Sequence, residues 1–257
     1  MPILFHDVIF GPVHSRRLGY SLGINLLPID SKYCSFNCIY CECGWNLEGN
    51  NHVVFTDRNV IFSELEERLK EIKSNNEPLD VITFAGNGEP TLHPEFLEIV
   101  EDVISLRDTY FPYIKIAVLT NSTRLSNTNV VKALKKIDLP ILKLDSVIES
   151  TFRKINNPPA TFNFNEYIIN LKKFNHRLII QTMFLRGEIN GSVIDNTTNI
   201  EVNELINVLK EIKPESVMIY SLDRQTPAKN LIKISSEELK QIAKKMKENY
   251  LPVQVTL

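Results

Sequence analysis

The chain has 257 residues, of which 43% are hydrophobic and 23% charged, a composition typical of a soluble globular protein with enough residues to bury a core. Its 29 basic and 31 acidic side chains give a net charge of −2, which excludes a strong overall field drawing it onto nucleic acid or anionic lipid. No apolar run approaches the roughly 18 residues of a membrane span, and the N-terminus lacks the basic flank of a signal peptide, so we expect a cytoplasmic protein without membrane contact.

Short apolar runs rich in β-branched residues alternate with longer amphipathic runs. The apolar runs predict six strands, at residues 23–27, 81–85, 115–119, 140–144, 178–184 and 216–221. Three amphipathic runs predict helices. The first has apolar residues from Ile61 to Ile72 and a capping-box pattern that begins at Ser63. The second starts at Pro94, because proline suits the first helical turn, and the third follows the helix-start sequence 235–238.

The centres of the last five predicted strands are roughly 25 to 40 residues apart, which is the length of a βα unit. Such units join through right-handed crossovers into a parallel sheet, so the fold class is α/β. The periodicity is compatible both with an open, doubly wound sheet and with a partial barrel. In either architecture ligands bind at the C-terminal ends of the strands, and the chemistry is expected there.

All four cysteines fall within ten positions, as Cys34, Cys38, Cys41 and Cys43. Disulfides between them would close only very short loops, whereas thiolates are preferred ligands of zinc and of iron in iron–sulfur clusters. The first three form C-x3-C-x2-C directly after the first predicted strand. A loop of this length can place three thiolates on three irons of a cubane and leave the fourth iron open.

Structural zinc bound by all four cysteines is the competing interpretation. Zinc sites usually space two C-x2-C pairs well apart, and the C-x-C pair of Cys41 and Cys43 suits a tetrahedral site poorly. The cluster is therefore favoured. Cys43 is then a fourth thiolate in the resting enzyme, a hydrogen donor to a substrate radical, or a bystander.

With this motif, and with the aromatic Tyr40 before the last cysteine, the sequence resembles the radical S-adenosylmethionine (SAM) superfamily. The resemblance implies a partial (βα)6 TIM-like barrel with one [4Fe–4S] cluster on Cys34, Cys38 and Cys41, SAM on the open iron, and Tyr40 near the adenine. It also implies that an electron, supplied by a reductant such as flavodoxin or ferredoxin, cleaves SAM to a 5′-deoxyadenosyl radical that abstracts hydrogen from a substrate.

The second predicted strand is followed by Gly86, Asn87, Gly88 and Glu89. Glycine allows positive φ and a close approach of backbone to a ligand, and a carboxylate behind such a turn can receive an ammonium group. A tight turn with a solvated glutamate has the same pattern. The segment resembles the glycine-glycine-glutamate motif of the superfamily, which implies that these four residues hold the amino group of SAM, with Asn87 as a departure from the motif.

Polar residues also follow the next strands. By the same resemblance, Asn121 and Ser122 contact the carboxylate or ribose of SAM, although turn and helix-cap chemistry explains these residue types equally well. Lys143 and Asp145 share one face of the fourth strand. Charges facing a barrel interior are costly unless paired or bound to a ligand, so these two are pocket candidates or a structural ion pair.

Gln181 and Met183 share one face of the fifth strand, while Arg186, Asp223 and Arg224 lie at strand ends where a polar or anionic substrate would be oriented. We assign Asp145, Gln181 and Met183 to cofactor binding. The candidate catalytic residues are Cys43, Lys143 and Asp223.

Several segments resemble a narrower group, the wyosine-synthase-like radical SAM proteins; they are residues 11–19, 21–25, 86–90, 144–145, 181–183 and 221–224. Because they extend over nearly the whole chain, we expect residues 1–257 to form one radical SAM domain, with 1–33 as the N-terminal segment and first strand leading into the cluster loop. Wyosine synthase modifies a methylguanosine in tRNA and carries a second cluster on cysteines N-terminal to the radical motif. No cysteine precedes Cys34 here, and this absence and the net charge of −2 argue against wyosine synthesis.

Two further functions stay open beside a tRNA-modifying enzyme. An activase that abstracts hydrogen from a partner protein suits the compact length, although the segment before the cysteines does not resemble that of glycyl-radical activases. A non-enzymatic, zinc-stabilised RNA-binding protein would show a basic face with exposed aromatics, whereas the basic residues here are mixed with acidic ones. The substrate is left as a small molecule, a peptide or RNA.

Overall fold

The computed structural model describes residues 3–47, 53–189 and 191–257. Its strands are β1 Ile9–Ser15, β2 Gly19–Ile24, β3 Val81–Phe84, β4 Lys115–Thr120, β5 Leu139–Lys143, β6 Ile179–Ile189, β7 Ser192–Asp195, β8 Ser216–Ser221, β9 Leu231–Lys233 and β10 Val253–Val255. The strand order is β1-β2-β3-β4-β5-β6-β8-β10, parallel throughout from β2 to β10. β1 pairs antiparallel with β2, and β7 and β9 pair antiparallel with the far end of β6.

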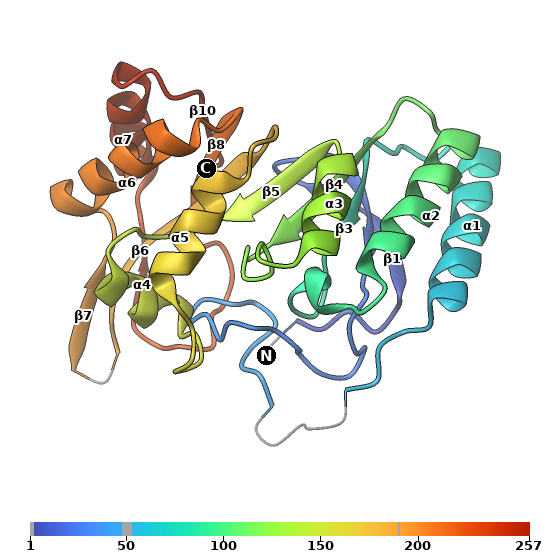
Figure 1. Ribbon diagram of the computed structural model, residues 1–257, viewed down its shortest axis with the longest axis horizontal. Helices are drawn as coiled ribbons and strands as arrows, with labels where there is room; N and C mark the ends of the chain where they lie inside the picture. Colours follow the sequence, from blue (N-terminus) through green and yellow to red (C-terminus); the bar gives the residue numbers. More distant parts are fainter. Residues whose placement is uncertain (1–2, 48–52, 190) are drawn as a thin grey trace.

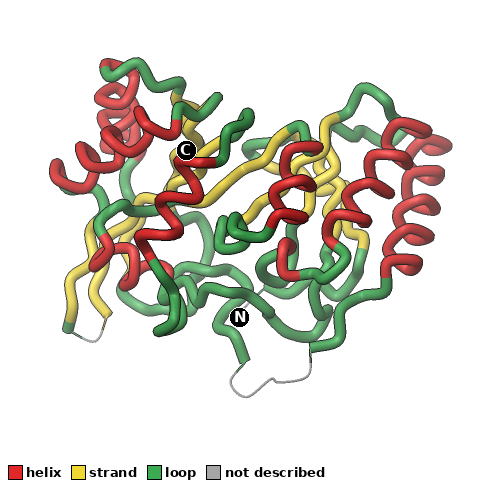
Figure 2. Tube along the Cα trace, in the orientation of Figure 1, coloured by secondary structure: helices red, strands yellow, loops and turns green. Residues whose placement is uncertain are grey.

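The helices are α1 Arg58–Asn75, α2 Phe96–Tyr110, α3 Thr128–Lys136, α4 Glu149–Asn156, α5 Phe164–Lys173, α6 Asn199–Ile212 and α7 Ser236–Glu248, with a short 3-10 helix, η1, at Pro90–Leu92. Figure 1 shows them outside the curved sheet, with α1, α2 and α3 side by side. In Figure 2 the long loops gather at the lower edge of the strands. None of the helices in the described ranges is long and apolar enough to cross a membrane.

Five of the six predicted strands correspond to β3, β4, β5, β6 and β8, and the predicted α/β class is confirmed. The predicted strand at 23–27 overlaps β2 only at Gly23 and Ile24, because β2 lies further toward the N-terminus. The hairpin strand β1 was not predicted, because its sequence contains the pair Gly11-Pro12, which is unfavourable in a central strand. An edge position tolerates the proline, since only one side of an edge strand needs hydrogen-bond donors. The structure therefore adds an antiparallel edge to the expected parallel sheet.

Two predicted helix starts are wrong. α1 begins at Arg58 rather than near Ser63, because Asp57 lies earlier and its carboxylate accepts a hydrogen bond from the backbone N of Asn59 (2.8 Å). Ser63 instead lies inside the helix, where its hydroxyl donates to the carbonyl of Val60. α2 begins at Phe96, so Pro94 lies before the helix rather than in its first turn.

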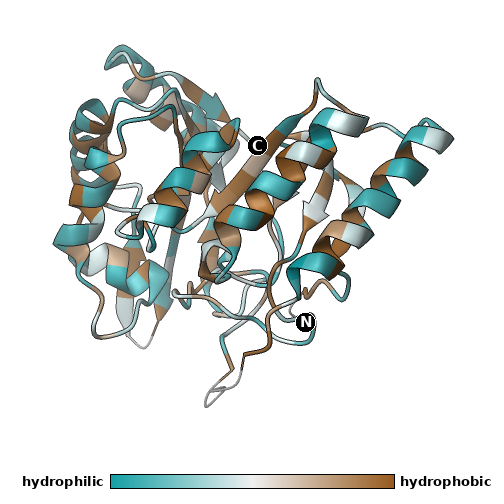
Figure 3. Cartoon of the chain, turned by 45° about the vertical axis from the view of Figure 1, so that its right-hand side comes forward, coloured by the Kyte–Doolittle hydropathy of each residue, from teal (hydrophilic) through white to brown (hydrophobic). Residues whose placement is uncertain are grey.

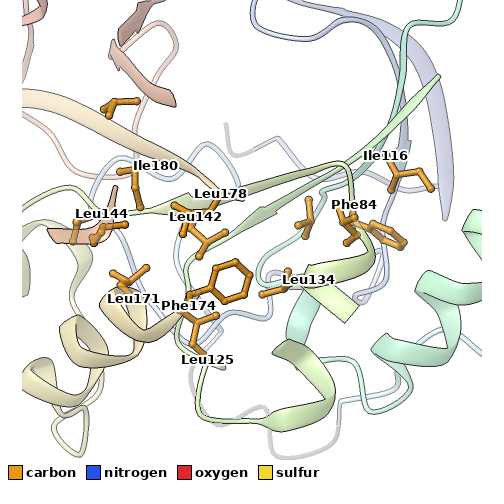
Figure 4. Close-up of a cluster of buried hydrophobic side chains, with 14 of the residues drawn as sticks. Phe84, Ile116, Leu125, Leu134, Leu142, Leu144, Leu171, Phe174, Leu178 and Ile180 are labelled. Atoms are coloured by element: carbon orange, nitrogen blue, oxygen red, sulfur yellow. The ribbon is translucent and has the colours of Figure 1, made fainter. Parts of the chain in front are cut away.

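The main core fills the space between the sheet and the helices. Figure 4 shows Phe84 of β3 and Leu142 of β5 facing Leu134 of α3 and Leu171 of α5, and all four are buried. Figure 3 shows the corresponding hydrophobic stripes along the helices, with hydrophilic residues on the outer side. Burying one such side chain contributes about 1.5–3 kcal/mol, so this layer stabilises the strands from whose ends the site is built.

The predicted helix start at 235–238 is confirmed as a reciprocal cap, in which the Ser235 hydroxyl accepts from the backbone N of Glu238 and the Glu238 carboxylate accepts from the backbone N of Ser235. We expect Ser235→Ala to lower the free energy of unfolding by about 1 kcal/mol in urea titrations. The matched control, Ser236→Ala, removes a neighbouring hydroxyl that does not cap α7. Equal losses from both variants would contradict the cap.

Candidate cofactor site

The cysteines lie on the loop that follows β2 and crosses the C-terminal ends of the parallel strands; it is part of the blue segment in Figure 1. On one side this loop is bonded to the turn after β3. Tyr33 N donates to the carbonyl of Asn87 (2.8 Å), and Glu89 N donates to the carbonyl of Tyr33 (3.1 Å). Gly88 has φ of 141°, and a Cβ there would lie 1.8 Å from the Tyr33 carbonyl oxygen, so only glycine permits this contact.

On the other side the cysteine loop is bonded to α4 and to the segment between β8 and β9. Asn37 N donates to the carbonyl of Asn156 (3.1 Å), and Ile39 N donates to that of Ile155 (3.0 Å). The carbonyl of Ile39 accepts from Ala228 N (3.2 Å). Phe36, which is 1% exposed, inserts between these contacts into a cluster of aromatic rings. The loop is thus fixed along both sides by backbone groups.

The four thiols lie in one neighbourhood but differ in their surroundings. Burial raises the pKa of Cys34 to about 12 and that of Cys38 to about 11. A hydrogen bond with the Cys43 thiol lowers the pKa of Cys41 to about 6, and the same bond raises the pKa of Cys43. The Cys43 thiol also lies 3.5 Å from the carbonyl oxygen of Gly86, so it is placed between the cysteine motif and the glycine turn.

The donor set fits an iron–sulfur cluster. Three cysteines with the expected spacing stand on a preformed loop, and the Asn121 amide nitrogen lies 3.4 Å from the Cys34 sulfur, a contact of the kind that tunes clusters. Within the three described ranges, no three His, Cys, Asp or Glu side chains are grouped so as to hold a single metal ion. A cubane has a different requirement, because each thiolate binds a separate iron.

Glu89 is not the solvated residue of the simple-turn interpretation. It is 1% exposed, and its carboxylate accepts from the backbone N and hydroxyl of Thr91, the hydroxyl of Thr120 and the backbone N of Asn121. Burial raises the pKa of Glu89, and these hydrogen bonds oppose the rise. The carboxylate therefore joins the turn after β3 to the end of β4. Its predicted contact with the amino group of SAM stays a prediction.

The other predicted residues of these two turns also support the loops. The Asn87 amide bonds to both backbone groups of Phe5 and to the carbonyl of Pro28, each at 2.8–2.9 Å, and so anchors the N-terminal segment. Asn121 donates to the Ser35 hydroxyl (2.9 Å). Ser122 is buried and has φ of 69°, which turns the chain sharply after β4.

Asp145, which is buried, forms one cluster with the half-buried Lys143 and Tyr40. The Lys143 ammonium contacts both the Asp145 carboxylate and the Tyr40 hydroxyl, and that hydroxyl donates to Asp145 (2.6 Å). The second oxygen of Asp145 accepts from the backbone N of Met183 (3.0 Å). Burial alone would lower the pKa of Lys143, but the carboxylate of Asp145 raises it. The predicted shared face is thus confirmed, and it contains the ion pair that the sequence left as an alternative.

The remaining candidates differ in placement. Gln181 donates to the Tyr220 hydroxyl (2.6 Å), whereas the Met183 side chain is buried in a small apolar cluster. Three charged candidates are paired near the surface: Arg186 with Asp195 and Glu238, Asp223 with Arg16 and Lys233, and Arg224 with Glu42. The Asp223 carboxylate pairs with two cations, Arg16 and Lys233. Its catalytic role stays a prediction.

Sequence reasoning missed several residues of the site. Asn46 donates to the carbonyls of Cys34 and Phe36 and so closes the cysteine loop. Asn156 lies 3.6 Å from the Cys38 sulfur, and nothing in its sequence context indicates this. Lys32 stands two positions before Cys34, and a charge so close to the motif could have indicated a role at the site. It is buried, and its ammonium donates to the carbonyl of Gly44 in the cysteine loop.

Two hollows border the site and share Trp45 as a wall. A cavity of about 480 Å³ is lined by Trp45 together with Lys154 and Lys229, among others. A second, of about 250 Å³, lies between Trp45 and Cys41. Trp45 is 42% exposed, so an aromatic face is available next to the last cysteine of the motif.

His93 follows the Glu89 turn and makes that part of the fold sensitive to acid. It is 3% exposed, its Nδ1 accepts from Glu95 N (3.1 Å), and its Nε2 lies 3.0 Å from the carbonyl of Thr56, which fits the neutral ring. Burial lowers the pKa of His93, so the unfolded chain binds this proton more readily. Stability therefore falls as the pH drops below the ordinary histidine value of about 6.5.

Urea titrations at about pH 7.5 and about pH 5.5 measure this effect. We expect the free energy of unfolding to fall more between the two pH values in wild-type protein than in His93→Gln. The comparison cancels the contributions of other titrating groups, because both proteins contain them. An identical loss in both would show that His93 does not contribute.

Solved structures with the same fold include Streptococcus suis SuiB bound to S-adenosylmethionine, with a TM-score of 0.64 at 17% identity over 91% of this chain and 50% of that one. TYW1 with a lysine-pyruvate adduct bound has a TM-score of 0.62 at 15% identity, over 91% of this chain and 75% of that one. These neighbours have the partial TIM barrel, so the predicted fold is confirmed.

Curated relatives are more similar in sequence. The UPF0026 protein MJ1312 of Methanocaldococcus jannaschii is 35% identical over 212 residues, 80% of this chain and 61% of that protein. A protein of Brachyspira hyodysenteriae named GTPase Obg is 31% identical over 246 residues, 94% of this chain and 34% of that protein. This chain thus spans less than two thirds of either relative. The model of the Radical SAM superfamily matches residues 29–195. Because that match covers more than half of the sequence, the chain belongs to the radical SAM superfamily, whose members bind a [4Fe–4S] cluster and SAM.

Proposed function

We propose that this protein holds one [4Fe–4S] cluster on Cys34, Cys38 and Cys41, binds SAM beside it, and abstracts a hydrogen atom from a substrate. The observation that carries the proposal is the cysteine loop itself. Its thiols stand at the C-terminal ends of the parallel strands, and backbone hydrogen bonds fix the loop to the glycine turn on one side and to α4 on the other.

When bound, the cluster supplies the electron that splits SAM into methionine and a 5′-deoxyadenosyl radical, and the radical becomes 5′-deoxyadenosine by taking a hydrogen atom. Enzymes of the superfamily need a one-electron reductant, for which we propose a flavodoxin or a ferredoxin. The protein's own part is to hold the loop and to limit access of water. The buried residues Glu89 and Asp145 fix the turns that border the site.

For SAM we propose the surface formed by Tyr40, the glycine turn 86–89, Asn121, Ser122 and the β6 residues Gln181 and Met183. Four hydrogen bonds support it. Tyr40 is tied to Asp145 and through it to Met183 N, and Asn121 is tied to Glu89 and to Ser35 of the cysteine loop. These bonds form two networks, one on the β6 side of the thiols and one between the glycine turn and the cysteine loop. The aromatic wall at Trp45 is where we place the substrate.

Within the superfamily we propose the wyosine-synthase-like branch, from the segments that resemble it along nearly the whole chain. The structure gives two of those segments supporting roles. Asn25 accepts a hydrogen bond from Asn87 N (3.1 Å) in the glycine turn, and Thr182 of β6 donates to the carbonyl of Leu144 (2.7 Å).

The test is anaerobic reconstitution with iron and sulfide, followed by addition of dithionite and SAM. We expect about four irons per chain and 5′-deoxyadenosine formed without substrate. Zinc without iron after reconstitution, together with intact SAM, would contradict the proposal and favour the structural-metal alternative. Adding tRNA or a candidate partner protein and following deoxyadenosine formation then separates a tRNA-modifying enzyme from an activase.

A further inference from the structure

Lys32 is a buried cation without a carboxylate partner in the described part of the chain. Lys32 is 4% exposed. Its ammonium donates to the carbonyl of Gly44 (2.9 Å) and lies 3.4 Å from the side-chain oxygen of Asn37. Both acceptors are neutral. Because burying a charge is costly unless an opposite charge compensates it, the position calls for an anion that these contacts do not provide.

The cysteine thiolates that hold the cluster would supply this negative charge. The Lys32 ammonium lies within the cysteine loop, because its two acceptors, Asn37 and Gly44, directly precede Cys38 and directly follow Cys43 in the chain. The other lysine of the site, Lys143, differs because Asp145 neutralises it. Lys32 therefore brings a net positive charge into the wall of the cluster site.

We propose that Lys32 is the counter-charge of the cluster and sets how readily it is reduced. This inference rests on the proposed function. Reduction adds one negative charge to a cluster that thiolates already make negative, and the potential of such clusters depends on net charge and on hydrogen bonds to the sulfurs. A fixed ammonium within the cysteine loop stabilises the reduced form more than the oxidised form. Lys32 is thus a positioning residue: it holds a positive charge near the cluster and takes no part in the reaction itself.

The experiment is a redox titration of the reconstituted protein, with the reduced cluster followed by electron paramagnetic resonance. Lys32→Gln and Lys32→Met remove the charge, and Lys32→Arg keeps it. We expect the ratio of reduced to oxidised cluster, measured at the wild-type midpoint, to fall about tenfold in the two neutral variants, which for a one-electron couple is 59 mV. Lys32→Arg should recover most of this ratio.

The matched control is Lys244→Gln, which removes an exposed charge on α7 and should leave the midpoint unchanged. A neutral Lys32 variant with a full cluster and the wild-type midpoint would overturn the inference. If the neutral variants are folded by circular dichroism but take up no iron while Lys32→Arg does, the charge is required for the cluster and the inference stands. If all three variants, including Lys32→Arg, take up no iron, the inference is overturned and Lys32 has a packing role.

The two proposals fail in different ways. Wild-type protein that takes up no iron and sulfide contradicts the proposed function before any variant is compared. Wild-type protein that binds the cluster, together with unshifted Lys32 variants, leaves the proposed function intact and contradicts only the role of Lys32.

Discussion

Cys38→Ala is expected to abolish the cluster while leaving the protein folded. Removing one of three thiolates leaves a second iron without a protein ligand, and this should lower retained iron and deoxyadenosine formation by at least about 100-fold. The fold should survive because, among the residues that the structure describes, the Cys38 side chain makes a single polar contact, at 3.6 Å to Asn156, and the loop is held by the backbone of its neighbours. Iron and sulfide analysis with circular dichroism measures both effects.

Cys43→Ala is the matched control, since it removes a thiol from the same neighbourhood. Cys43 lies between Cys41 and the Gly86 carbonyl but outside the C-x3-C-x2-C motif, so the variant should keep about four irons. Equal loss of iron from both variants would instead indicate ligation by four thiolates.

Gly88→Ala is expected to cost about 3 kcal/mol or more of unfolding free energy and to displace the cysteine loop. An alanine at φ of 141° is strained by roughly 1–2 kcal/mol, and overpacking adds about 1–3 kcal/mol. The added methyl would lie 1.8 Å from the Tyr33 carbonyl oxygen, a backbone atom that cannot rotate away. Urea unfolding measures the stability, and iron content after reconstitution measures the position of the loop.

Gly191→Ala is the control that separates the two effects of Gly88→Ala, the strain of a positive φ and the steric clash of the added methyl. Gly191 also has positive φ, 74°, but apart from its chain neighbours no described residue lies within 4 Å of the place where its Cβ would be. We expect a loss of about 1 kcal/mol and a normal iron content. If Gly88→Ala behaved no worse than Gly191→Ala, the close contact between the glycine turn and the cysteine loop would be contradicted.

The sequence was most informative where one pattern determines one structure. Buried parallel strands are continuous apolar runs, so the sequence alone predicts β3, β4, β5, β6 and β8. The alternation of Lys143 and Asp145 placed both on one face, and they are indeed in contact. Gly86 and Gly88 indicated a close approach, although the approaching groups are the side chain of Asn25 at Gly86 and the backbone of Tyr33 at Gly88.

The features that escaped prediction depend on contacts between distant residues. The sequence left Glu89 as either solvated or ligand-bound, because it does not show which groups donate to the carboxylate. The donors belong to Thr91, Thr120 and Asn121, and the last two lie on the next strand and its turn. Ser63 matched a cap pattern, but capping is decided by which residue ends the preceding extended segment, and that residue is Asp57. Such outcomes depend on tertiary structure, which local patterns do not contain.

The hydrogen bonds along the cysteine loop also determine the order in which the holoprotein matures. They join Tyr33 to Asn87, Asn37 to Asn156 and Ile39 to Ala228, so the loop takes its shape only after nearly the entire barrel has been synthesised and folded. Zinc fingers follow the opposite order, because their metal drives folding. In this protein we expect the barrel to fold before iron is inserted, because the hydrogen-bond partners of the cysteine loop lie far along the chain.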